Sequence, residues 1–354
     1  MPALPWEQSS FMKAARREPV ERVPIWLMRQ AGRYLPEYRQ LREKVSFLEL
    51  CRSPELAAEI TVSTVARLGV DAAILFADLL PILEPMGFDL RFGPDEGPVI
   101  RNPLRDPRDV ERVREFQDAD LNALDFVFQA VRLARANLPA EIPLIGFAGA
   151  PFTLAAYAIE GRTSRSFERT KRFLFAYPQA WQELMDRLVP SVGWYLKGQV
   201  DAGVQAVQLF DSWAGCLSPE HYRQFVLPYT QAVLGYLPQH VPVIYFLTGN
   251  PALIPLQAEV GGQVIGVDWR VDIADAWAAV GEDHAIQGNL DPAVLCASRE
   301  FVLEEARRIL EKTRGRPGHI FNLGHGVLPS TPVENVLALV DFVHAWDPQQ
   351  LPQS

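Results

Sequence analysis

The feature that most constrains this sequence is a series of eight short apolar runs separated by amphipathic, helix-like stretches. Several runs are continuously apolar rather than alternating, as in the Leu-Ile-Gly-Phe of residues 144–147. Continuous runs are typical of strands in parallel sheets, because helices cover both faces of such a sheet. The runs are residues 23–27, 72–76, 143–147, 204–210, 241–246, 263–267, 285–287 and 319–322.

This alternation predicts an α/β fold, a single-domain (β/α)8 TIM barrel over residues 1–354. An open, doubly wound sheet is the alternative, but no Gly-rich dinucleotide-binding pattern follows the first run. Residues 87–139 are interpreted as an insertion, with a polar hairpin at 89–101 and a long helix through 118–138. Hydroxyl–proline pairs predict helix starts at Ser53, Ser218 and Thr331, the last with a capping box closed by Glu334.

Charge and cysteine content limit the function classes. The chain has 34 basic and 43 acidic residues and a formal charge of −9, so nucleic acid is not expected as a partner and a polyanion would need a local basic pocket. Cys51, Cys216 and Cys296 are far apart and predict no disulfide framework. We find neither a secretory signal nor an apolar stretch of about 18 residues, and therefore expect a cytoplasmic protein without a membrane span.

In a barrel, reactive residues collect where the strands end, so the residues after each run are candidates. The first run is followed by Arg29 and Arg33, with Gln30, Ala31 and Gly32 between them. Each guanidinium can bind a carboxylate through two hydrogen bonds, and the glycine would let the backbone approach a ligand. An ordinary surface role for these arginines is an equal alternative, because the neighbouring sequence is rich in arginine.

Single polar residues follow four other runs: Asp78, Tyr157, Ser212 and His325. Each also has a plain structural interpretation, such as a loop cap for Asp78, core packing for Tyr157 and a free loop residue for His325. Ser212 lies outside a GxSxG turn, which disfavours a hydrolase nucleophile. Together with the arginines, these residues are expected at one rim of the barrel, and no metal-binding or phosphate-binding motif competes with them.

Two long strings carry a family resemblance. PIWLMRQAGRYLPEYR at residues 24–39 and GFAGAPFTLAAYAIEG at residues 146–161 resemble the two signatures of the uroporphyrinogen decarboxylase family. FADLLPILEPMG, QLFDSWAG, DWR and FNLGHGVLP also resemble segments of that family, in its order and spacing. The resemblance implies a dimeric (β/α)8 barrel that removes the four acetate carboxyls of uroporphyrinogen III without cofactor or metal. The product is coproporphyrinogen III, on the route to haem and chlorophyll.

The same resemblance implies a substrate site made of Arg29, Gln30, Ala31, Gly32, Arg33, Asp78, Tyr157, Ser212 and His325. Asp78, Arg29 and Tyr157 are expected to be catalytic. Asp78 would accept hydrogen bonds from the pyrrole NH groups and stabilise a cation formed on the ring, because an ionised carboxylate is purely an acceptor.

Two other functions are considered. Zinc-dependent corrinoid methyltransferases of the same superfamily hold zinc with a His-x-Cys pair and a later cysteine. At residues 246–249 this chain offers Phe246 and Thr248, which are poor zinc ligands, and His325 stands near the place of the later cysteine. A non-catalytic tetrapyrrole carrier would need the arginines but not Asp78.

Overall fold

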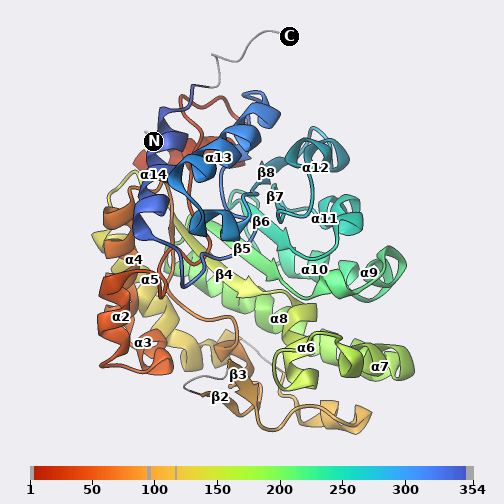
Figure 1. The fold of residues 1–354 in the computed structure, drawn as a ribbon. Helices are drawn as coiled ribbons and strands as arrows, with labels where there is room; N and C mark the ends of the chain where they lie inside the picture. Colours follow the sequence, from red (N-terminus) through yellow and green to blue (C-terminus); the bar gives the residue numbers. More distant parts are fainter. Residues whose placement is uncertain (1–3, 94–96, 116–117, 348–354) are drawn as a thin grey trace.

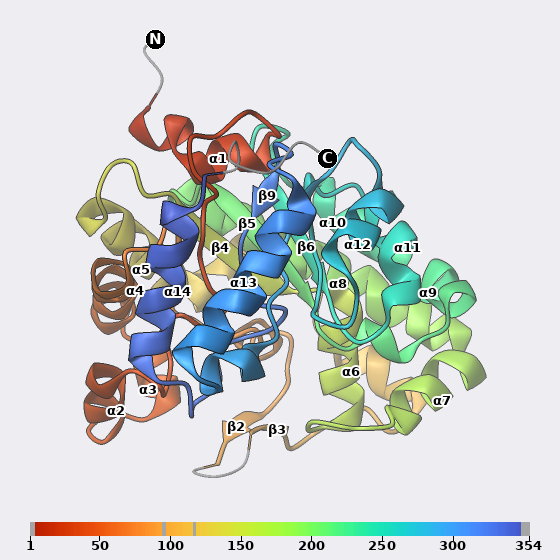
Figure 2. The same cartoon turned by 45° about the horizontal axis from the view of Figure 1, so that its top comes forward.

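The computed structural model describes residues 4–93, 97–115 and 118–347. At its centre is a curled parallel sheet of seven strands in the order β1-β4-β5-β6-β7-β8-β9, surrounded by helices (Figures 1 and 2). The strands are β1 Ala73–Ile74, β4 Leu144–Gly149, β5 Ala206–Asp211, β6 Val243–Leu247, β7 Val264–Gly266, β8 Ala285–Gln287 and β9 His319–Ile320. All these pairings are parallel, as the continuous apolar runs predict.

The first apolar run closes the sheet without forming a full strand. Ile25 makes a single parallel bridge with Phe321 beyond β9, and its carbonyl accepts a hydrogen bond from the amide of Asp71 at 2.8 Å. The ladder stops there because Pro24 has no N–H to donate, and the N–H of Ile25 donates to the Asp71 carboxylate at 2.8 Å. The α/β barrel class is confirmed, and one expected strand is replaced by this bridged segment.

The Asp71 carboxylate is buried and joins distant parts of the chain. Its Oδ1 lies 2.7 Å from Nη2 of Arg22, and its Oδ2 lies 2.8 Å from Nε2 of His344. His344 belongs to α14, Val333–Ala345. These partners offset the cost of removing a carboxylate from water. Asp71 therefore ties the first segment of the chain and α14 together next to β1, beside the backbone hydrogen bonds that connect Ile25 to both neighbours.

Most of the elements outside the central sheet are helices. The longer ones are α4 Pro54–Leu68, α5 Asp125–Asn137, α6 Pro151–Glu160, α7 Glu168–Ala176, α8 Pro178–Ala202, α10 Leu227–Leu234, α12 Ile273–Val280 and α13 Arg299–Thr313. The shorter ones are α1 Ser10–Ala15, α2 Pro36–Arg42, α3 Phe47–Arg52, α9 Pro219–Phe225 and α11 Ile254–Glu259. The 3-10 turns are η1 Pro5–Gln8, η2 Pro81–Leu83, η3 Pro107–Arg112, η4 Asp118–Leu124, η5 Ala214–Cys216, η6 Pro251–Leu253 and η7 Pro292–Cys296.

Helix starts follow the sequence signals in two of three places. Ser53 and Ser218 each accept a backbone N–H at the start of α4 and α9, as predicted. The capping box expected at Thr331 is wrong, because α14 begins one residue later with Pro332 as its N-cap. Thr331 is buried instead, and its hydroxyl lies 3.8 Å from the sulfur of Cys296.

The region expected as an insertion begins with a hairpin. Strands β2 Leu90–Phe92 and β3 Pro98–Ile100 pair antiparallel, outside the central sheet (Figure 2). The hairpin is tied to the end of α6, since the amide of Ile100 donates to the carbonyl of Gly161 at 2.7 Å. Downstream, η4 leads into α5, which packs against α4 and α8. The boundaries of the insertion and the single-domain division stay predictions.

Two sequence-level expectations concern the whole chain. Its three cysteines, Cys51, Cys216 and Cys296, are all free thiols. Within residues 4–93, 97–115 and 118–347, we find no helix that combines the length and apolar character needed to cross a bilayer.

Candidate active site

The segment that follows Ile25 presents Arg29 in a constrained backbone. Arg29 is exposed and has φ +58°, a left-handed conformation that costs a residue with a Cβ roughly 1–2 kcal/mol. Met28 holds it there: its amide donates to Oδ1 of Asn322 at 3.0 Å, and its carbonyl accepts from Val327 at 2.9 Å. The Arg29 side chain lies against Gly326, where an added Cβ would collide with it. Strain of this kind is typical of functional sites.

The buried side chain of Gln30 connects this loop to neighbouring backbone by hydrogen bonds. It is 1% exposed, its Oε1 accepts the amide of Leu27 at 3.1 Å, and its Nε2 donates to the carbonyl of Ala72 at 3.2 Å. The amide group of Gln30 is thus engaged by backbone. Gln30 can contribute to binding through the shape it gives the loop.

The other loop residues differ in exposure. Ala31 and Gly32 are half-buried, and a Cβ on Gly32 would lie 3.0 Å from the Arg29 carbonyl oxygen, a tight contact that favours glycine at this position. Arg33 is exposed. The two arginines therefore have different surroundings, with Arg29 pressed against a neighbouring loop and Arg33 open to solvent.

Asp78 lies just beyond the C-terminal end of β1. It is half-buried, and its Oδ1 accepts the amide of Leu80 at 2.9 Å. Burial raises the pKa of this carboxyl to about 6, against the opposing effects of the Leu80 amide and the charge of Arg29. A carboxylate with a raised pKa at this end of a barrel is a candidate functional group.

Tyr157 and Ser212 both neighbour Trp213, the first by ring stacking and the second in sequence. The ring of Tyr157, on α6, stacks on Trp213 with centroids 3.8 Å apart. Ser212 precedes Trp213 and follows β5 directly. Burial raises the pKa of Tyr157, and the charge of Asp78 raises it further, so the phenol keeps its proton at neutral pH and can donate it in a hydrogen bond.

The turn that carries Ser212 is anchored by a buried carboxylate. Asp211 is 0% exposed, and it accepts hydrogen bonds from Thr153 Oγ1 at 2.7 Å and Tyr245 Oη at 2.8 Å. The Tyr245 hydroxyl in turn lies 2.8 Å from that of Tyr222. Burial raises the pKa of Asp211 to about 6. Sequence reasoning singled out Ser212 and missed this anchor, although the aspartate stands next to it.

His325 is held neutral. Its Nδ1 accepts the amide of Gly326 at 2.7 Å, which leaves the imidazole proton on Nε2 as a donor. Burial lowers the pKa of His325 to about 4, and the charge of Arg29 lowers it further. His325 is therefore a neutral hydrogen-bond donor near pH 7.

The effects of charges on neighbouring pKa values indicate which predicted residues lie near one another. The charge of Arg29 acts on Asp78, Tyr157 and His325, and that of Asp78 acts on Tyr157. Ser212 is adjacent in sequence to Trp213, whose ring stacks on that of Tyr157. In the described ranges, no group of three or more His, Cys, Asp or Glu side chains is arranged to hold a metal ion.

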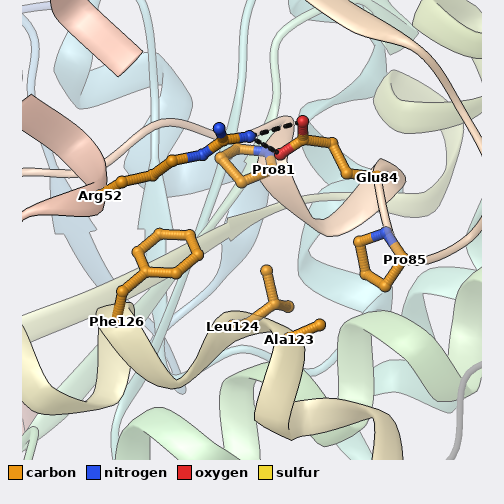
Figure 3. Close-up of a pocket in the computed structure, with 7 residues that line it drawn as sticks. All are labelled: Arg52, Pro81, Glu84, Pro85, Ala123, Leu124 and Phe126. Atoms are coloured by element: carbon orange, nitrogen blue, oxygen red, sulfur yellow. Dashed lines mark hydrogen bonds and ion pairs between the residues drawn. The ribbon is translucent and has the colours of Figure 1, made fainter. Parts of the chain in front are cut away.

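A separate pocket lies beside η2 (Figure 3). Its wall includes an ion pair between Arg52 and Glu84, whose nitrogen and oxygen are 2.6 Å apart. The other lining residues are Pro81, Pro85, Ala123, Leu124 and Phe126. The expected site residues do not line this pocket, so we place the candidate site at the strand ends.

The fold and the charged and aromatic groups gathered after its strands define the class, an α/β-barrel enzyme. The model of the uroporphyrinogen decarboxylase family matches residues 7–346. A curated uroporphyrinogen decarboxylase from Chloroflexus aggregans is 51% identical over 341 residues, covering 95% of each chain. One from Sorangium cellulosum is 52% identical over 336 residues, again covering 95% of each chain. The chain belongs to the uroporphyrinogen decarboxylase family, as its motifs predict.

Solved structures support the fold independently. A methyltransferase from Methanosarcina mazei superposes with a TM-score of 0.80 at 22% identity, covering 94% of this chain and 97% of the other. A putative vitamin B12-independent methionine synthase from Listeria monocytogenes gives 0.59 at 11% identity, covering 92% and 97%. At such low identity the likeness concerns the fold alone.

Proposed function

We propose that this protein removes the four acetate carboxyls of uroporphyrinogen III and so produces coproporphyrinogen III. The proposal rests mainly on Asp78. This carboxylate follows the end of β1, its pKa is raised by burial, and the positive charge of Arg29 acts on it. Family membership supplies the substrate class. The protein accordingly acts as a carboxy-lyase of tetrapyrrole biosynthesis.

The chemistry needs an electron sink for the bond between the acetate methylene and its carboxyl group. Protonation of a pyrrole carbon makes the ring cationic, so that the substrate itself accepts these electrons as a cofactor would elsewhere. Asp78 accepts hydrogen bonds from the pyrrole NH groups and stabilises that cation. At ~4 Å such a pair gains about 4 kcal/mol at an effective dielectric of 20, against about 1 kcal/mol in water. The desolvation of Asp78 therefore favours its role.

The remaining residues have proposed roles around the ring. Arg29 and Arg33 bind peripheral carboxylates, and Arg29 also takes part in catalysis. The hydroxyls of Tyr157 and Ser212 donate to the acetate that is lost, and Nε2–H of His325 donates to a propionate. Gln30, Ala31 and Gly32 complete the site by shaping the arginine loop.

The setting of the reaction is also proposed. We infer that the enzyme works in the cytoplasm, as a homodimer, in haem and chlorophyll formation. Its single barrel domain carries the insertion at about residues 87–139, and the reaction uses neither metal nor cofactor. Its partner is the small-molecule substrate uroporphyrinogen, and we expect neither nucleic acid nor a membrane as a partner.

The methyltransferase and carrier alternatives are disfavoured by particular residues. Where a zinc-binding His-x-Cys pair would stand, the chain has Phe246 and Thr248, and the Thr248 hydroxyl donates to Asp268 at 2.7 Å. A carrier has no need of a desolvated Asp78.

The test is anaerobic incubation with uroporphyrinogen III, following CO2 release and the hepta-, hexa-, penta- and tetracarboxylate products, with zinc measured on the same sample. We expect four CO2 per ring without stoichiometric zinc. Binding without CO2 release would support the carrier, and one zinc per chain would support the methyltransferase.

A further inference from the structure

A second charged cluster follows β6 and β7, beyond the residues assigned above. Asp268 is 5% exposed and accepts four hydrogen bonds. The donors are Thr248 Oγ1 at 2.7 Å, the amide of Gly249 at 2.7 Å, the amide of Arg270 at 2.9 Å and Nη1 of Arg270 at 2.5 Å. The carboxylate is well satisfied by its neighbours, and it fixes the position of one edge of the Arg270 guanidinium.

The Arg270 side chain is oriented but still open. Its guanidinium carbon lies 4.1 Å from the centre of the Trp269 ring, and the side chain is 44% exposed. Within the described part of the chain, the hydrogen bonds of its guanidinium involve Nη1, on Asp268 and Thr248. Nε and Nη2 therefore remain as donors. The hydrogen bond to Asp268 and the stacking on Trp269 hold the Arg270 guanidinium in one orientation, which lowers the entropy lost when it binds an anion.

The loop that carries Arg270 packs against the turn that carries His325, a residue of the candidate site. On one flank, a Cβ on Gly324 would come within 2.5 Å of the Trp269 amide nitrogen. On the other flank, a Cβ on Gly326 would collide with Arg29. The loop that carries Arg270 therefore packs against Gly324 and the Arg29 side chain against Gly326, the two neighbours of His325, and the charges of both arginines act on its imidazole.

We infer that Arg270 is a further substrate-binding residue, which holds a propionate on the opposite flank of the His325 turn from Arg29. This rests on the proposed function. A fixed guanidinium suits a propionate because every pyrrole of the substrate carries one and keeps it through all four decarboxylations. Whichever ring is reacting, a propionate is available to Arg270, whereas acetates disappear as the reaction proceeds.

The test compares Arg270→Gln with the parent protein. We measure the KM for uroporphyrinogen III and, by calorimetry under nitrogen, the Kd of coproporphyrinogen III, which carries propionates but no acetates. Loss of one charge-assisted hydrogen-bond pair should raise both by about tenfold, with kcat changed by less than about twofold. Arg270→Lys keeps the charge without the fork and should give a smaller rise in both.

The chain offers a matched control in Arg316. Its guanidinium stacks on Trp277 at 4.3 Å, but it lies between α13 and β9, at the other end of the barrel. Arg316→Gln should leave KM and Kd unchanged. A rise in the control equal to that in Arg270→Gln would overturn the inference, since it would reflect general loss of charge.

Other outcomes also decide the matter. If Arg270→Gln binds coproporphyrinogen as the parent does, Arg270 merely neutralises Asp268 and the inference is wrong. If only the octacarboxylate is bound more weakly, the group held is an acetate and the propionate assignment is wrong. Should Arg270→Gln lose its thermal transition, an unchanged Kd in Arg270→Lys overturns the inference instead. The Kd needs no turnover, so a parent that releases no CO2 refutes the proposed function separately.

Discussion

Replacing Asp78 with asparagine separates the functional role of this residue from its contribution to folding. Burial raises the pKa of Asp78 from 3.8 to about 6, so the ionised group is less stable in the folded protein than in the unfolded chain. A shift of that size corresponds to about 3 kcal/mol, an upper value because the side chain is only half-buried. Asparagine retains an oxygen that can accept the Leu80 amide, so Asp78→Asn should fold.

The variant should be more stable and far less active. A neutral amide cannot stabilise a pyrrolic cation, and loss of one preorganised group of this kind costs on the order of 10²–10³ in rate. Removal of the desolvated charge should raise the free energy of unfolding at pH 7 by about 1–3 kcal/mol. The parent protein accordingly accepts a stability cost at this position for its function.

The pH dependence has a definite sign. The folded pKa of Asp78 lies above the unfolded value, so its contribution to stability is full below pH 3.8 and is lost as the pH rises through about 6. The stability gap between Asp78→Asn and the parent should therefore open between these values and be constant above them. Ionised Asp78 is the active form, so kcat/KM of the parent should fall as the pH drops below about 6.

The assay pairs product analysis with urea unfolding at several pH values. Asp283→Asn is the control, because that side chain is 95% exposed, and it should leave both readouts unchanged. Near-normal turnover by Asp78→Asn would remove Asp78 from the mechanism. Lower stability than the parent at pH 7 would refute the desolvation argument.

Three further predictions concern neighbouring residues. Asp211→Asn should abolish the fall in stability that the buried Asp211, with its pKa raised to about 6, contributes between pH 4 and pH 6; equal pH slopes for variant and parent would contradict this. Tyr157→Phe keeps the stack on Trp213 and should lower kcat without lowering the melting temperature; unchanged kcat would exclude the hydroxyl from the reaction. Ser53→Ala removes the N-cap of α4 and should cost about 1 kcal/mol in urea unfolding, with kcat unchanged as its control.

Much of the fold could be predicted because its signals are local. Continuous apolar runs specify strands covered on both faces, and Ser53 and Ser218 mark helix starts within a few residues. The first run lacks a full strand partly for a local reason, the missing N–H of Pro24, and partly for one that is not local. The Asp71 side chain, distant in sequence, takes the N–H of Ile25 that a strand would have used.

The candidate site was predictable in position but only partly in chemistry. Strand ends in a parallel barrel share one rim, so Asp78 and His325 could be expected there from sequence. Gln30 is different, because its amide is engaged by Leu27 and Ala72 within the barrel wall. The tyrosine partner of Asp211 lies on the next strand, at Tyr245, and a single sequence offers no signal for that contact.

The closure of the barrel at Ile25 has a consequence for motion. A seam with a single backbone bridge should open more readily than the ladders elsewhere, so the amide of Trp26, which donates to Phe321 at 3.3 Å, should exchange with deuterium sooner than amides of β5. Arg29 stands three residues beyond Trp26, on the same segment. An anion bound by Arg29 would stabilise this segment in its closed position, so ligand occupancy and protection of the seam from exchange should rise together.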